Sequence, residues 1–490
     1  MTPIRWAVAL VALAAIALSV LRLEGARSGL DIARISVGQT PVTDYALPGS
    51  DGPVVVVAHG FAGSRQLMEA YALTLARAGY RVLSFDFEGH GRHSVPMGGD
   101  VDAIDGTTRR LIDQTRTMID HAAGLSDRPV ALLGHSMASD VLVRTAGEDP
   151  RAGPLVLVSA FSGAIGPEVP ADMLLITGEW EPGLREAAVR YVQMVDPAAS
   201  EGELARAGDA RRQAVVAPRV EHVGVLYSAT GLAATRNWLD DAYGLESQPA
   251  PLAATGGWIA LLLAGLVALA WPLSALLPVR APSPDPVPRG TYWIAMLVPA
   301  FVTPVALSFV DLRLLPVLVA DYLALHLFFY GLLALVLMWR GGVWLGAVAL
   351  WPTLALLLYG IGVFGLALDR YAASFMPTPE RLWIIAAVAI GAVPFMVSDA
   401  VVTRGGAAPY WQRLLARGVF LASLGLAVAL DFERLFFLIM ILPVIVLFLV
   451  IFGQMGSWAG RRTGLPLVPG LALGICLAWA IGVSFPLFSA

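Results

Sequence analysis

Hydrophobic residues follow two contrasting patterns along this chain. Residues 26–250 mix charged positions with short apolar runs that alternate with amphipathic stretches. The parts before and after this region contain long apolar runs, each about as long as the ~17–25 residues that a membrane-spanning helix needs. The pattern therefore predicts an α/β domain at 26–250, a transmembrane anchor at 1–25 and a membrane domain of about eight helices at 251–490.

Short, continuous apolar runs within the α/β domain predict buried strands. They lie at residues 53–60, 81–87, 129–136, 153–160, 173–178 and 212–220. Amphipathic helical patterns at 64–79 and 108–124 lie between the first of these runs. Continuous apolar strands that alternate with such helices are typical of a mostly parallel sheet covered on both faces. In these sheets, sites form at the carboxyl ends of the strands.

The first long apolar run, residues 5–23, begins at Arg5. No A-x-A-like cleavage site follows it, so we interpret it as an uncleaved signal anchor, with a signal peptide as the alternative. Further apolar runs predict eight more membrane helices, near 257–278, 291–310, 314–338, 342–367, 382–402, 415–430, 435–453 and 465–488.

The arginines in alternating loops predict the orientation of the chain in the membrane. Nine lie on the side of the N-terminus: Arg5, Arg280, Arg289, Arg340, Arg404, Arg413, Arg417, Arg461 and Arg462. Four lie in the short loops of the other side: Arg313, Arg370, Arg381 and Arg434. Because cytoplasmic loops are enriched in arginine, we expect a multi-pass cell-membrane protein with a cytoplasmic N-terminus and an extracytoplasmic α/β domain. One missed or additional span would invert every loop after it.

Composition agrees with a large membrane-embedded part. Hydrophobic residues make up 57% of the 490 residues and charged residues only 14%, whereas soluble domains have about 45–50% and about 25%. The net charge of -4 gives no reason to expect nucleic-acid binding. The single cysteine, Cys476, excludes an intrachain disulfide framework.

Ionisable side chains within predicted spans are functional candidates by default. Here they are Asp321, His326 and Asp399. Four other carboxylates fall in the predicted outer loops, which is their ordinary place: Asp311, Asp369, Asp431 and Glu433.

The segment LLGHSMAS, residues 132–139, places Ser136 between a predicted strand and a helical pattern. A serine on a sharp strand-to-helix turn exposes its Oγ atom above the first amides of the helix. Gly134 and Ala138 are small enough for such a turn to close. The pattern predicts a nucleophile, and the alternative is an ordinary serine in a strand–helix turn.

Five motifs in order resemble the α/β-hydrolase superfamily over roughly residues 35–245. They are HGFAGS (59–64), DFEGHGRH (86–93), GHSMA (134–138), GEWEPG (178–183) and EHVGVLY (221–227). The resemblance implies an α/β-hydrolase fold, joined here to an all-α transmembrane domain that resembles no family we can name. The family pattern ends in glycine where this chain has Ala138, a residue small enough to be tolerated.

The resemblance implies the chain order nucleophile, acid, histidine. A serine hydroxyl needs a neighbouring base, and only His222 and His326 follow Ser136 in the sequence. His326 lies in a predicted membrane helix, whereas His222 follows the last predicted strand and matches the family motif. We therefore expect His222 to be the base.

The resemblance places the acid three residues beyond Gly178, at Glu181. The family has aspartate there more often, but glutamate is accepted. Glu179 is an alternative, and both side chains could also be solvated loop carboxylates. Asp172 precedes its strand, at the wrong end of the sheet.

The same motifs imply an oxyanion hole made by the backbone N–H groups of Phe61 and Met137. Residues expected to support the site are His59, Gly60, Gly134, His135, Asp86 and His90. His90 and His93 lack a clustered acidic or cysteine partner, so we expect neither a metal nor another cofactor.

Only about a dozen residues separate the runs at 153–160 and 173–178. Many members of the superfamily insert a helical lid there, so we expect a site that is open, or covered by the membrane domain or the membrane surface.

The sequence predicts a membrane-integrated serine hydrolase. It would cleave an ester, thioester or amide of a lipid, acylated or other amphiphilic substrate through an acyl-enzyme. Alternatives are an acyltransferase, a lyase or peptidase of the same superfamily, and a transporter or assembly protein whose hydrolase-like domain only binds a partner.

Overall fold

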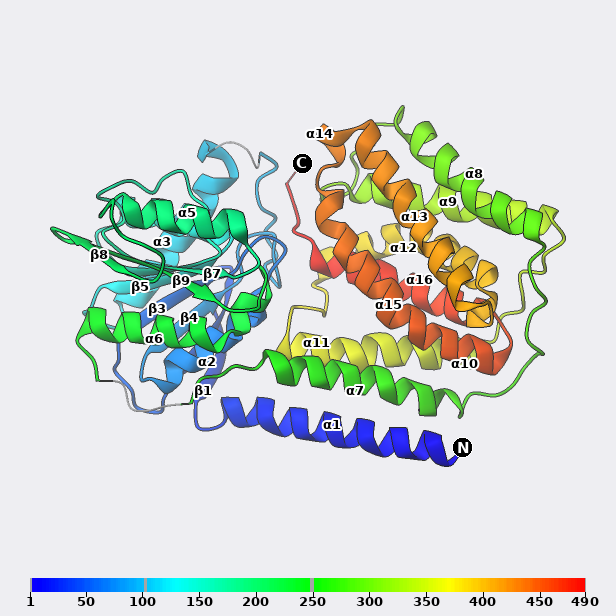
Figure 1. The fold of residues 1–490 in the computed structure, drawn as a ribbon, viewed down its shortest axis with the longest axis horizontal. Coiled ribbons are helices and arrows are strands. Elements are labelled where there is room, and N and C mark those ends of the chain that lie inside the picture. Colours follow the sequence, from blue (N-terminus) through cyan, green and yellow to red (C-terminus); the bar gives the residue numbers. More distant parts are fainter. Residues whose placement is uncertain (1, 101–103, 247–250, 490) are drawn as a thin grey trace. The chain divides into compact units, whose positions relative to one another are not determined.

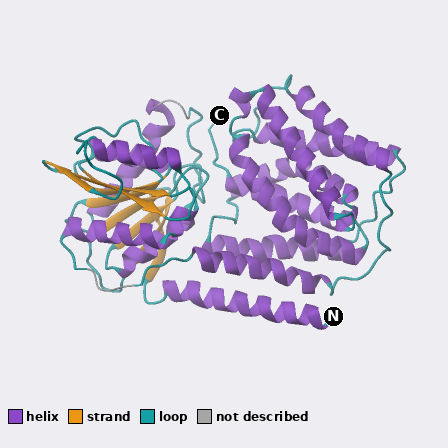
Figure 2. Ribbon diagram, in the orientation of Figure 1, coloured by secondary structure: helices purple, strands orange, loops and turns teal. Residues whose placement is uncertain are grey.

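The computed structural model describes residues 2–100, 104–246 and 251–489 (Figure 1). The described strands all lie between Asp31 and Ala217, whereas helices occur along the whole chain (Figure 2). The predicted contrast between a sheet-containing region and helical regions is thereby confirmed.

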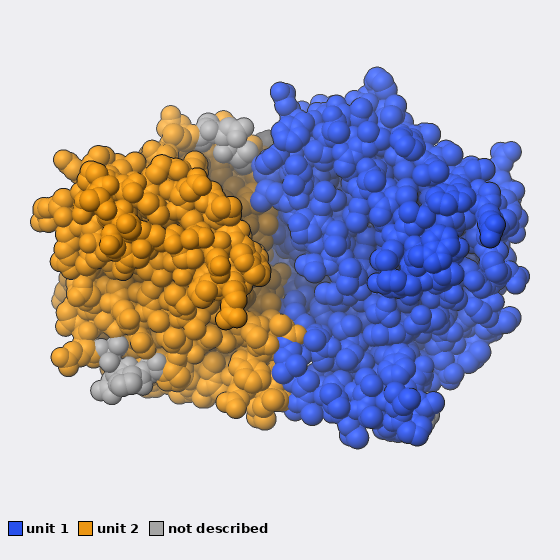
Figure 3. All heavy atoms as spheres, viewed as in Figure 1, with its two compact units in different colours: residues 1–17, 261–368, 375–485 blue, residues 18–260, 369–374, 486–490 orange. Residues whose placement is uncertain are grey.

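Contacts divide the chain into two compact units (Figure 3). Unit 1 contains residues 1–17, 261–368 and 375–485, and unit 2 contains residues 18–260, 369–374 and 486–490. The domain boundaries expected from the sequence stay a prediction, and the one at residue 250 lies outside the described residues.

Unit 2 is built on a nine-stranded sheet in the order β1-β2-β4-β3-β5-β6-β7-β9-β8. The strands are β1 (Asp31–Val37), β2 (Thr40–Ala46), β3 (Val54–Ala58), β4 (Arg81–Phe85), β5 (Val130–His135), β6 (Ala152–Val158), β7 (Asp172–Gly178), β8 (Leu204–Ala207) and β9 (Ala210–Ala217). The strands from β4 to β9 in this order pair in parallel. All six predicted runs form these central strands, while the antiparallel edge strands β1, β2 and β8 were not predicted.

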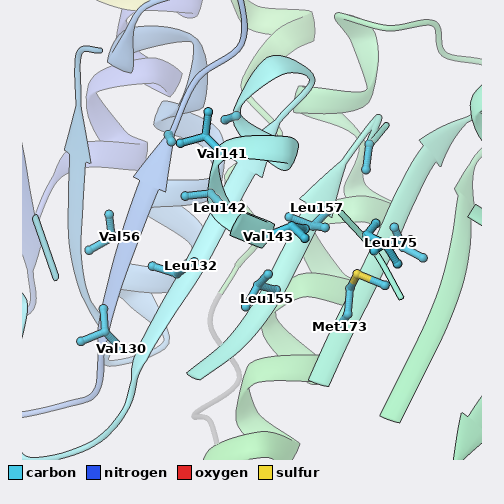
Figure 4. Packing of buried hydrophobic residues seen from close by; sticks show 14 of the residues in the cluster. Val56, Val130, Leu132, Val141, Leu142, Val143, Leu155, Leu157, Met173 and Leu175 are labelled. Carbon is cyan, nitrogen blue, oxygen red and sulfur yellow. The ribbon is translucent and has the colours of Figure 1, made fainter. Parts of the chain in front are cut away.

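Helices cover both faces of this sheet. One face packs against α3 (Arg109–Ala123), α4 (Met137–Glu148) and α5 (Pro182–Gln193), and Figure 4 shows part of that cluster. The other face packs against α2 (Glu69–Arg77) and α6 (Ala229–Tyr243). Neighbouring residues of β5 point to opposite faces, so Leu132 belongs to the first cluster and Leu133 to the second. Because both faces are buried, the strands read as continuous apolar runs.

Unit 2 also contains a short π-helix, Ile104–Thr108, and 3-10 turns at Arg65–Met68 and Gly224–Tyr227. The loop between β6 and β7, residues 159–171, contains neither helix nor strand. The parallel strands bring their carboxyl ends to one edge, where the loops after β3, β5, β6, β7 and β9 meet.

The described residues contain nine helices that are long and apolar enough to span a membrane. They are α1 (Pro3–Arg27), α7 (Gly256–Ser274), α8 (Arg289–Leu307), α9 (Ala320–Arg340), Leu350–Tyr371, α12 (Pro379–Val402), α13 (Tyr410–Leu430), α15 (Leu438–Thr463) and α16 (Leu467–Ser484). The span Leu350–Tyr371 consists of α10 (Leu350–Leu357), a π-helical turn and α11 (Gly365–Tyr371), and a short α14 (Phe432–Leu435) precedes α15. These helices agree with a multi-pass membrane protein.

Small residues allow two helices of unit 1 to pack closely. A Cβ atom on Gly474 of α16 would lie 2.6 Å from the Cα atom of Val393 in α12. A Cβ atom on Gly470 would lie 2.8 Å from the Cα atom of Val397. Such backbone approach replaces hydrophobic burial as a source of association between membrane helices.

The ionisable residues expected inside spans of unit 1 all have polar partners. His326 is fully buried, with its Nε2 atom 3.1 Å from the hydroxyl of Ser423. Asp399 lies near the end of a predicted span. It is buried and accepts a 3.0 Å hydrogen bond from Arg417. Asp321 accepts the backbone N–H groups of residues 314 and 315 at 3.1 and 2.9 Å. Pairing of this kind satisfies polar groups that would otherwise be costly in a membrane.

Candidate active site

Ser136 lies on the turn that joins β5 to α4. It has φ 53 and ψ -116, a left-handed region that is strained for a residue with a side chain. Its N–H donates a 2.9 Å hydrogen bond to the carbonyl of Val158, which ties the turn to β6. A Cβ atom on Gly134 would lie 2.6 Å from Leu142 and 3.0 Å from the Cβ atom of Ala138. The turn therefore needs glycine at 134 and a small residue at 138.

His222 lies on the loop after β9 and reaches the serine. Its Nε2 atom is 2.9 Å from Ser136 Oγ, and its Nδ1 atom is 2.6 Å from Glu181 Oε1. With the proton on Nδ1, the ring donates to the carboxylate and accepts from the hydroxyl, which is the arrangement a general base requires. The His222 side chain is 45% exposed, so water can reach the base.

Glu181 follows β7 and is largely buried. Its Oε2 atom accepts hydrogen bonds from the backbone N–H of Gly178 at 2.6 Å and from the hydroxyl of Ser159 at 2.7 Å. Burial alone would raise the pKa of Glu181, but the hydrogen bonds from His222, Gly178 and Ser159 outweigh it and lower that pKa. The carboxylate is therefore ionised when the site is at neutral pH.

Glu179 and Asp172, the other carboxylates considered as the acid, bind partners other than His222. Glu179 is exposed and accepts a 2.6 Å hydrogen bond from the backbone N–H of Arg219. Asp172 begins β7, at the opposite end of the strand from the site, and pairs with Arg211 at 3.0 Å. Of these three side chains, Glu181 is the one that the structure brings to His222.

The loop after β3 lies against the serine. A 3.0 Å hydrogen bond from the N–H of Gly63 to the carbonyl of Gly60 closes a turn in which Ala62 has φ 54. A Cβ atom on Gly60 would lie 3.0 Å from the Cβ atom of Ser136. Phe61 is part of this turn, and Met137 is the first residue of α4. Their role as oxyanion donors stays a prediction.

His59 connects this loop to the chain after β4. Its Nε2 atom accepts the N–H of Phe87 at 3.1 Å, and its Nδ1–H donates to the carbonyl of Gly60 at 2.8 Å. Burial lowers the pKa of His59, which keeps the ring neutral in this bridging state. The ring of His90 packs against His59 with 5.1 Å between ring centroids.

His135 holds the loop that carries the base. Its Nε2–H donates a 2.9 Å hydrogen bond to the backbone carbonyl of His222. Burial, assisted by the neighbouring His222, lowers the pKa of His135 to about 3, so the ring stays neutral. The His135 ring therefore contacts the backbone of His222, and the Nε2 atom of His222 stays available to Ser136.

Asp86 organises the loop formed by the DFEGHGRH motif. Its carboxylate accepts the backbone N–H groups of Arg65 at 2.8 Å and Arg92 at 3.0 Å, and it pairs with the Arg65 guanidinium. Gly91 has φ 52, and a Cβ atom there would lie 2.4 Å from the Asp86 carboxyl carbon. This loop thus requires both a buried carboxylate and a glycine.

No group of three or more His, Cys, Asp or Glu side chains among the described residues could hold a metal ion. His90 donates from Nδ1 to the carbonyl of Glu88 at 2.9 Å, and His93 accepts the N–H of Val95 at 3.1 Å. Both rings therefore form hydrogen bonds with the backbone of their own loop.

Sequence reasoning missed Ser159, which supports the acid. It follows β6, has φ 52, and its N–H donates to the carbonyl of Ile176 at 2.7 Å. Its hydroxyl is the one that binds Glu181. The available signal was its position at the end of a predicted strand, at the same edge of the sheet as Ser136.

Three exposed apolar residues that lie on the loops of the site were also missed. Phe161, Trp180 and Val223 are 66%, 63% and 48% exposed. Trp180 and Val223 are direct neighbours of Glu181 and His222, and the Phe161 N–H lies 3.3 Å from Ser139 in the first turn of α4. All three belong to the loops that carry Ser136, Glu181 and His222 or contact them, so they are candidates for a substrate-binding surface.

The fold and the site together define an α/β-hydrolase domain. A mostly parallel sheet, covered on both faces, presents a serine on a strand-to-helix elbow at its carboxyl edge. Residues 50–211 match the model of a family described as serine aminopeptidase S33. The match includes Ser136 and Glu181, whereas His222 lies beyond it. The resemblance to α/β-hydrolases is thus confirmed for this part of the chain.

Individual relatives also match only part of the chain. Over 117 residues the chain is 30% identical to a candidate non-heme haloperoxidase of Mycobacterium phage D29, and this covers 24% of the chain and 38% of that relative. A dienelactone hydrolase structure from Anabaena variabilis shares 18% identity with a TM-score of 0.34, covering 45% of this chain and 100% of the other. The structure of a membrane phospholipase A, described as a bacterial virulence factor, shares 14% identity with a TM-score of 0.35, covering 47% of this chain and 92% of the other.

Proposed function

We propose that this protein is a membrane-integrated serine hydrolase that cleaves an ester, thioester or amide bond of an amphiphilic substrate. The observation that carries the proposal is the continuous hydrogen-bonded chain from Ser136 Oγ through His222 to Glu181. We also propose a cytoplasmic N-terminus and an extracytoplasmic hydrolase domain, as the distribution of loop arginines predicts.

The first half of the reaction forms an acyl-enzyme. Ser136 Oγ attacks the substrate carbonyl while the Nε2 atom of His222 takes its proton. The carbonyl oxygen becomes an oxyanion, for which the N–H groups of Phe61 and Met137 are the proposed donors. His222 then gives its proton to the leaving alcohol, thiol or amine as the bond to the carbonyl carbon breaks.

The second half reverses these roles with water. His222 takes a proton from a water molecule that attacks the acyl carbon, and it returns this proton to Ser136 Oγ when the acid leaves. The exposure of the His222 ring lets water reach the base, as hydrolysis requires. The ionised Glu181 stabilises the imidazolium in both halves and fixes the tautomer.

Exposed apolar residues on the loops of the site support an amphiphilic substrate. Phe161, Trp180 and Val223 offer an uncharged surface to the part of a substrate next to its carbonyl. Each methylene that such a surface removes from water contributes about 0.8 kcal/mol. The short loop between β6 and β7 adds no helix that would limit the length of an acyl chain.

Labelling with a fluorophosphonate probe tests the catalytic part of the proposal. We expect the full chain in detergent to be labelled once per molecule, and both Ser136→Ala and His222→Ala to lose labelling. A folded wild-type protein that does not react would reduce the domain to a binding module, and labelling that survives Ser136→Ala would place the nucleophile elsewhere.

A series of p-nitrophenyl esters from acetate to dodecanoate tests the substrate class. We expect kcat/KM to rise with chain length by up to about 4-fold per methylene over the first few methylenes. The double variant Phe161→Ser, Trp180→Ser should flatten this dependence while leaving acetate hydrolysis nearly unchanged. A wild-type enzyme that prefers acetate would contradict the amphiphilic substrate.

A further inference from the structure

Unit 2 includes two short segments that are distant in sequence from its sheet. Residues 369–374 contain the end of α11 and the chain after it, and residues 486–489 follow α16. Asp369 was expected to be an ordinary carboxylate of an outer loop. It lies instead in the last turn of α11, where it is buried.

The first segment, residues 369–374, contacts two loops near the site. Asp369 accepts a 2.5 Å hydrogen bond from the guanidinium of Arg92. The N–H of Ser374 donates a 3.0 Å hydrogen bond to the hydroxyl of Ser64. Ser64 directly follows the turn at 60–63 that lies against Ser136.

The same segment is fixed at its centre by Glu24. Arg370 donates to both carboxylate oxygens of Glu24, at 3.0 and 2.9 Å, and the hydroxyl of Tyr371 donates to it at 2.7 Å. Three consecutive residues, 369–371, therefore have side-chain partners within unit 2. A merely connecting loop would have no need of such a set of charged contacts.

The second segment, residues 486–489, pairs with the loop between residues 89 and 97. The N–H of Leu487 donates to the carbonyl of Gly89 at 2.9 Å, and the carbonyl of Leu487 accepts the N–H of Met97 at 2.9 Å. Ser489 then donates to the carbonyl of Met97 at 2.8 Å. A Cβ atom on Gly89 would lie 2.4 Å from the Leu487 carbonyl oxygen, so this pairing depends on glycine.

The first segment connects to the proposed oxyanion loop through Asp86, and the second pairs with the loop that contains Arg92. The N–H groups of Arg65 and Arg92 bind the Asp86 carboxylate. Arg65 follows Ser64, and Arg92 is the partner of Asp369. Two paths thus run from residues 369–374 to the loop at 59–65: one directly through Ser64 and one through Arg92 and Asp86.

We propose that residues 369–374 and 486–489 position the oxyanion loop, residues 59–65, so that catalysis by the sheet domain depends on chain supplied from beyond it. This inference rests on the proposed serine-hydrolase function. Asp369 and Ser374 are positioning residues, because they act through Arg92 and Ser64. A shift of about 1 Å in an oxyanion donor of this loop, the N–H of Phe61, can cost on the order of 10²-fold in rate. Binding of the substrate in its ground state would stay largely intact.

The variant Asp369→Asn tests this dependence, with Asp311→Asn as its matched control. Asp311 is an exposed carboxylate that also pairs with an arginine in the loop after a predicted span. We expect Asp369→Asn to lower kcat by about 10- to 100-fold, with KM within about 2-fold of wild type. Asp369→Glu, which keeps the carboxylate, should restore most of the lost kcat. Asp311→Asn should have no effect. Rates are divided by the active sites that a fluorophosphonate titrates, which removes any unfolded fraction.

A double-mutant cycle sharpens the test. Arg92→Gln should lower kcat as much as Asp369→Asn does, and the double variant should be no slower than either single variant, because both remove one interaction. Independent, multiplying losses would overturn the proposed path through Arg92. Leu487→Pro, which removes the donor to Gly89, is expected to lower kcat separately and to add to the loss.

The outcomes separate the two proposals. A wild-type chain that a fluorophosphonate does not label would overturn the serine-hydrolase function itself. A labelled and active wild type, with Asp369→Asn and Leu487→Pro both at wild-type kcat, would overturn only the positioning of the oxyanion loop.

Discussion

Each unit of this protein contains a histidine within hydrogen-bonding distance of a serine hydroxyl. In unit 2 the Nε2 atom of His222 is 2.9 Å from Ser136, and in unit 1 the Nε2 atom of His326 is 3.1 Å from Ser423. The two distances differ little. A serine–histidine contact is therefore a weak indication of catalysis when it is considered alone.

The surroundings distinguish the two pairs. The second nitrogen of His222 binds the carboxylate of Glu181, whereas that of His326 lies 3.4 Å from the hydroxyl of Tyr322. Ser136 has a strained backbone on an elbow, and its base is partly exposed. His326 is fully buried. A catalytic pair needs an orienting carboxylate, a serine presented by the backbone, and access for substrate and water.

Removing the two serine hydroxyls gives the largest expected difference between the pairs. Ser136→Ala should lower ester turnover on the order of 10⁵- to 10⁶-fold, the scale found when a triad serine is lost. Ser423→Ala should stay within about 2-fold of wild type. Steady-state hydrolysis by the purified full chain measures both. Comparable losses would mean that the buried pair takes part in the reaction.

The carboxylate is the next distinguishing feature. Glu181→Gln keeps the side-chain shape but removes the acceptor that fixes the tautomer of His222, so kcat should fall on the order of 10³- to 10⁴-fold. Glu179→Gln is the matched control, two residues earlier and bound to a backbone N–H. A larger loss in Glu179→Gln would identify it as the acid and would show that the observed hydrogen bond is not the functional one.

The close approach of the oxyanion loop to Ser136 has a smaller expected effect on catalysis. In Gly60→Ala the new methyl group would lie 3.0 Å from both the Cβ atom of Ser136 and the Nδ1 atom of His135, so the loop must shift by a few tenths of an ångström. We expect kcat/KM to fall by about 10- to 100-fold. Gly166→Ala, where no atom lies within 4 Å, should leave it unchanged. An unaffected Gly60→Ala would argue against a tightly placed loop.

The last prediction concerns the dependence of stability on pH. Burial lowers the pKa of His135 from 6.5 to about 3, so between these values the unfolded chain binds a proton that the folded chain does not. Stability should therefore fall as pH decreases through this window, by at most about 1.4 kcal/mol per pH unit. His135→Gln keeps a donor for the carbonyl of His222 but does not titrate, so thermal unfolding should depend less steeply on pH. An unchanged slope would assign the dependence to other groups, such as His59, whose pKa burial also lowers.

The central part of the fold was predictable because its strands are buried on both faces. The run at 129–136 contains no charged residue, and the structure has β5 there. Edge strands are different, since β1 alternates exposed and half-buried residues and includes Asp31 and Arg34. No continuous apolar run could indicate it. The helical patterns at 64–79 and 108–124 were predictable for a different reason, because polar and apolar residues alternate there with a helical period.

The site was predictable only where contacts follow strand order. Ser136, His222 and Glu181 each follow a strand, so a parallel sheet is expected to bring them to one edge. Arg92 and Asp369 are 277 residues apart in the sequence. Asp369 follows no strand, so the order of the strands does not predict this contact. Charge alone could not indicate it, because Asp369 reads as a solvated loop residue. The catalytic roles themselves stay predictions until the substitutions above are measured.

The order of synthesis gives the segment 486–489 a further consequence. The last strand of the sheet that carries the site ends at Ala217, but the partner of Gly89 and Met97 is made roughly 270 residues later. At about 5–20 residues per second, a ribosome needs roughly 14–54 s for that stretch. During this time the nascent chain already carries serine, base and acid but not the segments proposed to position the oxyanion loop. The hydrolase would then mature only after its membrane helices exist, which delays its full activity until the chain that embeds it has been translated.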